Sequence, residues 1–161
     1  MCDRECVRQG IADAEHWSSP FTKRPEPLGL ASTSEDAFFW HSSRGFHLVT
    51  HSWRTCGAPL PSSPDKPNPK AGSCGAYSFS TDSRTWYDSS TPFYESEVRW
   101  ENGTTTNLRA RQRPQILFGP AAAGQNPRPL YLFNGVTSIE NGSARSWTMA
   151  VPFAAARDST M

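Results

Sequence analysis

The order of apolar and polar residues along residues 34–53 predicts a β-hairpin. An aromatic run at residues 38–40 forms its first strand, and residues 41–45 form the turn, where Gly45 can take a positive φ. Residues 46–53 then alternate with the period of two that a half-buried strand requires. This alternation places one set of side chains on a common face: His47, Val49, His51 and Trp53.

Further strands are predicted along the rest of the chain, at residues 74–80, 95–101, 104–118, 130–136 and 146–153. Fourteen prolines and eleven glycines argue for many turns and against long helices. In one of these turns, which leads back to Trp86, Asp82 is expected to accept backbone N–H hydrogen bonds and form an Asx-type turn. We therefore predict an all-β fold of antiparallel β-propeller blades. At ~40–50 residues per blade, the chain would supply about three blades, which are too few to close a ring.

The chain divides into three predicted segments. Residues 1–33 form an irregular arm that ends in an edge strand, residues 34–153 form the propeller-like segment, and residues 154–161 form a flexible tail. A proline-rich loop at residues 54–73 interrupts the second segment.

Composition and charge bear on the core and on the classes of partner to expect. Hydrophobic residues make up 36% of the chain and aromatic residues 12%, so the core must be built from rings. The net charge of +1, without a long basic run, gives no reason to expect a nucleic-acid partner. No apolar run approaches the ~18 residues of a membrane span, and residues 1–10 do not form a signal peptide. We expect no cofactor.

Cysteines and glycosylation sequons nevertheless point to the secretory pathway. Cys56 and Cys74 flank the proline-rich loop and are candidates for a disulfide, with free buried thiols as the alternative. Asn102 and Asn141 each begin a sequon at an Asn-Gly turn, which is also a good hairpin turn without a glycan. We expect an extracellular protein, and a chain that is a fragment of a longer one.

No metal site is predicted. The pair Cys2 and Cys6 has no matching second pair for zinc. His47 and His51 share a strand face, but no third ligand for a metal ion is found beside them.

Three motifs resemble the five-bladed β-propeller glycosidases of the arabinanase, levansucrase and invertase superfamily. They are Ser-Glu-Asp-Ala-Phe-Phe-Trp at residues 34–40, Ser-Thr-Asp-Ser-Arg-Thr-Trp at residues 80–86, and Arg-Gln-Arg-Pro-Gln-Ile-Leu-Phe at residues 111–118. Leu-Phe-Asn-Gly-Val follows at residues 132–136, and the match covers residues 34–136. The resemblance implies an incomplete five-bladed propeller that binds carbohydrate where its inner strands converge.

The resemblance implies a catalytic role for Asp36, which would tune the acid or stabilise positive charge. The other candidates would bind substrate: Glu35, Gln112, Arg111, Arg113, Trp40, His51 and Asn134. Period two places Glu35 and Asp36 on opposite faces, and it places Arg111 and Arg113 together on one face. Gln112 stands where the related strand carries Glu, and an amide cannot donate a proton as a carboxylic acid does.

Whether the chain is an enzyme is therefore left open. The first hypothesis is a glycoside hydrolase-like propeller segment that recognises carbohydrate, with its activity in doubt because of Gln112. The alternatives are a non-catalytic secreted carbohydrate-binding or structural module, and a truncated gene product. The expected partners are a carbohydrate ligand and the missing blades of the same chain.

Overall fold

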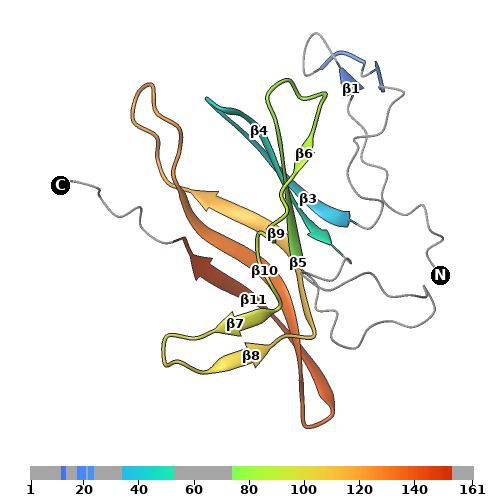
Figure 1. Ribbon diagram of the computed structural model, residues 1–161, viewed down its shortest axis with the longest axis vertical. Coiled ribbons are helices and arrows are strands. Elements are labelled where there is room, and N and C mark those ends of the chain that lie inside the picture. Colours follow the sequence, from blue (N-terminus) through green and yellow to red (C-terminus); the bar gives the residue numbers. More distant parts are fainter. Residues whose placement is uncertain (1–11, 14–17, 21, 24–33, 53–73, 154–161) are drawn as a thin grey trace.

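A computed structural model describes residues 12–13, 18–20, 22–23, 34–52 and 74–153 of the chain. These residues form antiparallel sheets and contain no helix (Figure 1), which confirms the predicted all-β class. No helix within these ranges is therefore long and apolar enough to cross a membrane.

The first large sheet is a four-stranded antiparallel meander in chain order. It contains β3 (Ser34–Ser42), β4 (Gly45–Ser52), β5 (Cys74–Ser80) and β6 (Tyr87–Asp88). Phe38 lies opposite Val49, and Trp40 lies opposite His47. The predicted hairpin is thus confirmed, with Gly45 at φ 136° just after the turn.

The second large sheet is a three-stranded meander of β9 (Ala110–Phe118), β10 (Pro129–Glu140) and β11 (Ser143–Pro152). Asn141 and Gly142 connect β10 to β11 with φ values of 50° and 78°. Two consecutive positive φ values are what a tight hairpin turn with the right twist requires. The Asn-Gly turn predicted here is therefore confirmed.

Two small sheets complete the described structure. β1 (Ala12–Asp13) pairs with β2 (Thr22–Lys23), within the segment that was predicted to be an arm. β7 (Glu97–Arg99) pairs with β8 (Thr105–Asn107), so the predicted strand at residues 104–118 is divided into β8 and β9. The predicted loop at residues 54–73 and the tail at residues 154–161 lie outside the described residues.

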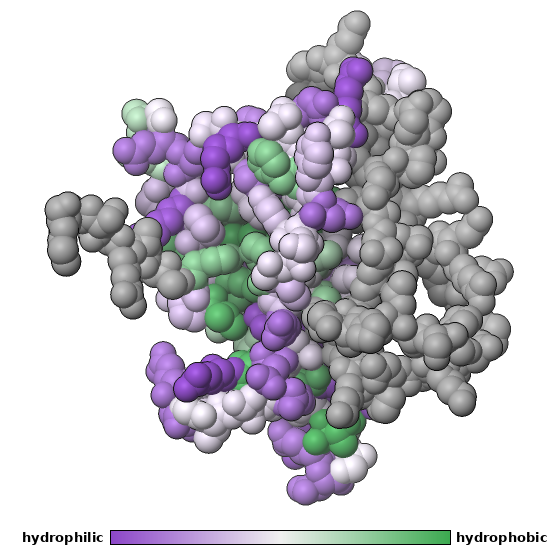
Figure 2. Space-filling view, in the orientation of Figure 1, coloured by the Kyte–Doolittle hydropathy of each residue, from purple (hydrophilic) through white to green (hydrophobic). Residues whose placement is uncertain are grey.

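The main core lies where the two large sheets meet. β9 packs against β3, β4 and β5, so the first strands of both meanders adjoin. Val49, Tyr94, Ile116 and Leu132 are buried there, and six partly buried aromatic residues surround them: Phe38, Trp40, Tyr77, Phe93, Phe118 and Phe153. In Figure 2 hydrophobic colouring gathers near the middle of the visible face, with polar colouring above and below it. The expectation of a core built from rings is therefore largely met.

A second, smaller core holds the β7–β8 hairpin against the second meander. Val98 and Leu108 come from the hairpin and its exit, and they pack against Val136 and Met149 of β10 and β11. In Figure 1 this hairpin lies at the lower left, beside β10 and β11.

The turn after β5 takes the predicted form. Asp82 accepts hydrogen bonds from the backbone N–H groups of Arg84 and Thr85, both at 2.8 Å, and from the Ser80 hydroxyl at 3.0 Å. The N–H donors of Thr85 and Arg84, in that order, lower the pKa of Asp82 to about 2. Trp86 then lies near Phe39, with their ring centroids 6.3 Å apart.

Candidate functional site

A break in the strand alternation near the start of β3 builds the candidate site. The pairing of β3 with β4 shifts register between Glu35 and Phe38, and Asp36 within this shift has a φ of 54°. A left-handed residue in a strand is typical of a β-bulge, which redirects the side chains around it. The prediction that Glu35 and Asp36 point to opposite faces is therefore wrong.

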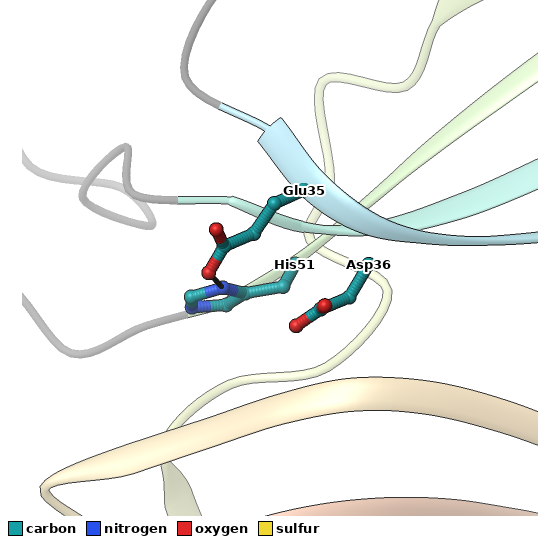
Figure 3. A group of neighbouring side chains, drawn as sticks. All are labelled: Glu35, Asp36 and His51. Atoms are coloured by element: carbon teal, nitrogen blue, oxygen red, sulfur yellow. Dashed lines mark hydrogen bonds and ion pairs between the residues drawn. The ribbon is translucent and has the colours of Figure 1, made fainter. Parts of the chain in front are cut away.

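Glu35, Asp36 and His51 come together on one side of the sheet, as Figure 3 shows. Glu35 lies opposite His51 across the strands, and the Glu35 Oε1 atom is 3.0 Å from His51 Nδ1. One carboxylate oxygen of Asp36 joins them, so that the three ligand atoms lie within 4.8 Å of one another. The His51 side chain is completely buried, the Glu35 side chain is 35% exposed, and Asp36 is exposed.

A second bulge occurs in β9. Its pairing with β10 shifts register between Phe133 and Gly135, and Arg113 has a φ of 53°. Arg111 is buried, whereas Arg113 is exposed. The extra residue puts the two arginines out of phase, so the prediction that they share a face is wrong.

Arg111 is held by a network inside the protein. Its Nε donates to Asn134 Oδ1 at 2.9 Å, and one terminal nitrogen donates to the carbonyl of Glu95 at 2.9 Å. The guanidinium also lies over the Tyr94 ring, 4.7 Å from its centroid. Asn134 Nδ2 in turn donates to the carbonyl of Gln112 at 3.3 Å. These contacts hold the Arg111 and Asn134 side chains against the β9 and β10 strands and the segment that carries Tyr94.

Tyr94 connects this network electrostatically to Asp36. Burial raises the pKa of Tyr94 above its ordinary value; the nearby Arg111 opposes the rise, and the negative charge of Asp36 adds to it. Burial also lowers the pKa of Arg111, and Tyr94 counteracts this shift. Asp36 is therefore close enough to Tyr94 for its charge to raise the pKa of that residue.

Gln112 and Arg113 line a different place, a polar surface hollow of about 300 Å³. Gly135, Thr137 and Trp147 are among the residues that complete its wall, and neither Glu35 nor Asp36 belongs to it. The structure thus separates Gln112 from the two carboxylates with which the sequence grouped it.

Trp40 lines a third place, an aromatic hollow of about 470 Å³ at the turn end of β3 and β4. Other aromatic and polar side chains complete its wall, among them Tyr77, Phe93, Phe118, Arg44 and Asn126. Trp40 stacks on His47, with centroids 4.8 Å apart and planes 8° from parallel. Trp40 therefore lies in a different hollow from Gln112, and the hollow does not include Asp36.

His47 differs from His51 in its partners. Its Nε2 pairs with the Ser42 hydroxyl and its Nδ1 with the Tyr77 hydroxyl, both at 2.7 Å. Burial lowers the pKa of His47, and the charges of Arg44 and His41 lower it further. The sequence placed His47 and His51 on one strand face without a third metal ligand. In the structure, His51 instead lies beside Glu35 and Asp36.

The sequon and cysteine residues are placed as follows. Asn102 and Asn141 are both exposed at hairpin turns, and glycosylation of either stays a prediction. Cys74 is disulfide-bonded. Cys2, Cys6 and Cys56 all fall outside the described residues, so the Cys56–Cys74 pairing also stays a prediction.

Sequence reasoning missed Tyr94 and Tyr77 as members of these sites. Tyr94 follows a stretch of turn residues in which apolar and polar residues do not alternate, so its aromatic side chain was the only sign that it could be buried. The bulges were equally hidden, although Asp at position 36 is a residue type that tolerates positive φ.

Comparison of the chain with protein-family models, with curated proteins and with solved structures finds no significant match.

Proposed function

We propose that this chain is a carbohydrate-recognising segment of a glycoside hydrolase-like β-propeller, in which Asp36 contacts the sugar. The observation that carries the proposal is the bulge in β3, which directs the exposed Asp36 carboxylate to the same side as Glu35. Paired carboxylate oxygens accept hydrogen bonds from the neighbouring hydroxyl groups of a sugar ring.

Repetition between the two meanders supports the propeller part of the proposal. The bulge residues Asp36 and Arg113 have φ values of 54° and 53°, and each lies in the first strand of its meander. These first strands, β3 and β9, also pack against each other. Successive blades around one axis would place equivalent strands side by side, each with the same bulge.

The outer face of the second meander supports the presence of further blades. Leu117 and Tyr131 lie opposite each other on this face, and Phe133 follows two residues later. Leu117 is 48% exposed and Tyr131 is 42% exposed. A propeller blade is covered on both faces by its neighbours, so another blade of the same protein would bury this apolar surface.

Carboxylate spacing favours recognition over hydrolysis by this pair. Retaining glycosidases hold their two carboxyl groups ~5–5.5 Å apart and inverting enzymes ~6.5–9.5 Å apart, on either side of the bond that is cleaved. Glu35 and Asp36 are neighbours in one strand, and one carboxylate oxygen of each lies within 4.8 Å of the other. Glu35 is also hydrogen-bonded to His51. The pair is therefore better arranged to hold one sugar unit than to flank a glycosidic bond.

The test is a glycan array probed with the full chain, followed by hydrolysis assays on aryl glycosides and on every oligosaccharide that binds. We expect binding without turnover, and we expect Asp36→Asn to weaken the binding by about tenfold, or ~1.4 kcal/mol. Asn also tolerates a positive φ, so this variant removes the charge while it keeps the bulge.

Glu101→Gln serves as the matched control, because it removes an exposed carboxylate at the turn between β7 and β8. Equal binding by the wild type and Asp36→Asn would remove Asp36 from the sugar site. If Trp40→Leu abolished binding while Asp36→Asn did not, the sugar would belong to the aromatic hollow. Absence of binding to any glycan would contradict the proposed function as a whole.

A further inference from the structure

We propose that Glu35, Asp36 and His51 form a binding site for one divalent metal ion of the manganese-to-zinc series. The site would hold the ion through one imidazole nitrogen and two carboxylate oxygens, and it would leave the remaining coordination positions open. The inference uses residues of the candidate sugar site, but it stands without the proposed function because it requires no sugar.

The donor atoms indicate the class of metal. Imidazole nitrogen suits zinc, iron and nickel, whereas carboxylate oxygen suits manganese and the alkaline-earth ions. A set of one nitrogen and two oxygens therefore favours ions that accept both, and Ca²⁺, which takes six to eight oxygen ligands, is disfavoured. The two negative charges also balance the charge of a dication.

The distances fit a shared ion. Metal–ligand bonds to nitrogen and oxygen are ~2.0–2.2 Å long, so two donors at a right angle on one ion lie ~3 Å apart. His51 Nδ1 and Glu35 Oε1 are 3.0 Å apart. The whole set spans no more than 4.8 Å, against ~4.3 Å for two donors on opposite sides of an ion. A small rotation of the exposed Asp36 side chain would close that difference.

The three ligands combine one buried side chain with two that solvent can reach, as a metal site with open coordination positions requires. The buried His51 has little freedom to move, because its strand β4 is the second strand of the sheet, between β3 and β5. Asp36 is exposed, and Glu35 is partly so, which leaves an approach for the ion from solvent. When the ion binds, the lone pair of His51 Nδ1 would face the metal, and the contact between His51 and Glu35 would be replaced by two metal–ligand bonds.

Mn²⁺ is the probe for the test, because it prefers oxygen and nitrogen ligands, whereas cysteine sulfur selects softer ions and the chain has four cysteines. Titration of the full chain with Mn²⁺, followed by the electron paramagnetic resonance signal of the free ion, should give one bound ion per chain. Water-proton relaxation of the same samples should rise above that of free Mn²⁺, because open positions on an immobilised ion hold exchanging water.

Asp36→Asn and Glu35→Gln each remove one anionic ligand while they keep the shape of the side chain. Each should weaken Mn²⁺ binding by about tenfold or more, since even supporting residues around metal sites change affinity by ~10–100-fold. Two matched controls should bind Mn²⁺ as the wild type does: Glu140→Gln, an exposed carboxylate paired with Arg145, and His47→Gln, another buried histidine of β4.

A wild-type chain that leaves the free Mn²⁺ signal unchanged up to millimolar protein would overturn the inference, as would variants of Glu35 and Asp36 that bind like the controls. The result is separable from the proposed function. Sugar binding that persists in chelator, together with no Mn²⁺ binding, would reject the metal site and leave the sugar site standing. Mn²⁺ binding without any glycan ligand would do the opposite.

Discussion

Asp36 shows how one backbone angle decides where neighbouring side chains lie in this chain. Its φ of 54° lies in the left-handed region, which costs a residue other than glycine roughly 1–3 kcal/mol. Asp tolerates this region better than most residues because its short side chain can bond locally. This strained backbone allows the side chains of Glu35 and Asp36 to lie on the same side of the sheet as His51.

His47 should make stability depend on pH. Its folded-state pKa lies below the ordinary value of 6.5, so the unfolded chain binds more protons as the pH falls through that value. The contribution of His47 to the free energy of unfolding should be at its full value above pH 6.5 and should be lost as the pH falls toward the lower pKa of the folded state. Urea denaturation at several pH values between about 8 and 5 measures this slope.

His47→Gln should flatten the slope, because glutamine does not titrate. The comparison is one of slopes, so it holds even if the variant is less stable at every pH. His41→Gln is the control, since His41 is exposed, and it should retain most of the slope. A variant at position 47 with the slope of the wild type would show that another group causes the pH dependence.

Among the elements, β5 depends on a glycine for its packing. Gly75 exchanges backbone hydrogen bonds with the segment that carries Tyr94: its N–H donates to the Tyr94 carbonyl at 2.9 Å, and its carbonyl accepts from Phe93 at 2.7 Å. A Cβ atom at position 75 would collide with the Tyr94 ring. Gly75→Ala should therefore lower the free energy of unfolding by ~1–3 kcal/mol in urea denaturation.

Gly135 offers the matched control in β10. A Cβ atom there would meet no other atom within 4 Å, and its φ is not positive. Gly135→Ala should leave stability unchanged or raise it slightly, because alanine restricts the unfolded chain. Equal losses from both variants would contradict the packing argument for Gly75.

The strands themselves could be predicted from the sequence, but their bulges could not. Aromatic runs and Asn-Gly turns carry a strong local signal, and the β3–β4 and β10–β11 hairpins follow from it. A bulge adds one residue without altering the composition of its strand, so strict alternation misplaced the side chains at positions 36 and 113. Long-range packing also separated Trp40, Gln112 and Asp36, since sequence order gives no measure of which sheet face meets another.

On the scale of the whole molecule, the two meanders are joined mainly by β9, which packs against three strands of the first sheet. Cys74 begins β5, one of those three strands, and it is disulfide-bonded. A covalent link at this point would limit how far the unfolded chain can expand.

Cys56 is the expected partner of Cys74, and peptide mapping without reductant should recover the two cysteines in one linked peptide. Closing a loop of this size stabilises the folded state by ~3 kcal/mol on the chain-entropy estimate, so Cys56→Ser should lower the free energy of unfolding by about that amount. Cys2→Ser is the control and should leave stability unchanged. A peptide that links Cys74 to Cys2 or Cys6 would refute the pairing.

The left-handed backbone at position 36 also restricts how this protein can change over generations. Glycine, asparagine and aspartate are the residues that fit such a conformation most easily, and aspartate alone among them carries a charge. Asparagine and glycine are each one base change away from aspartate. The fold can therefore lose the carboxylate charge at position 36 in a single mutational step without losing the bulge, whereas most other replacements at this position would destabilise the strand.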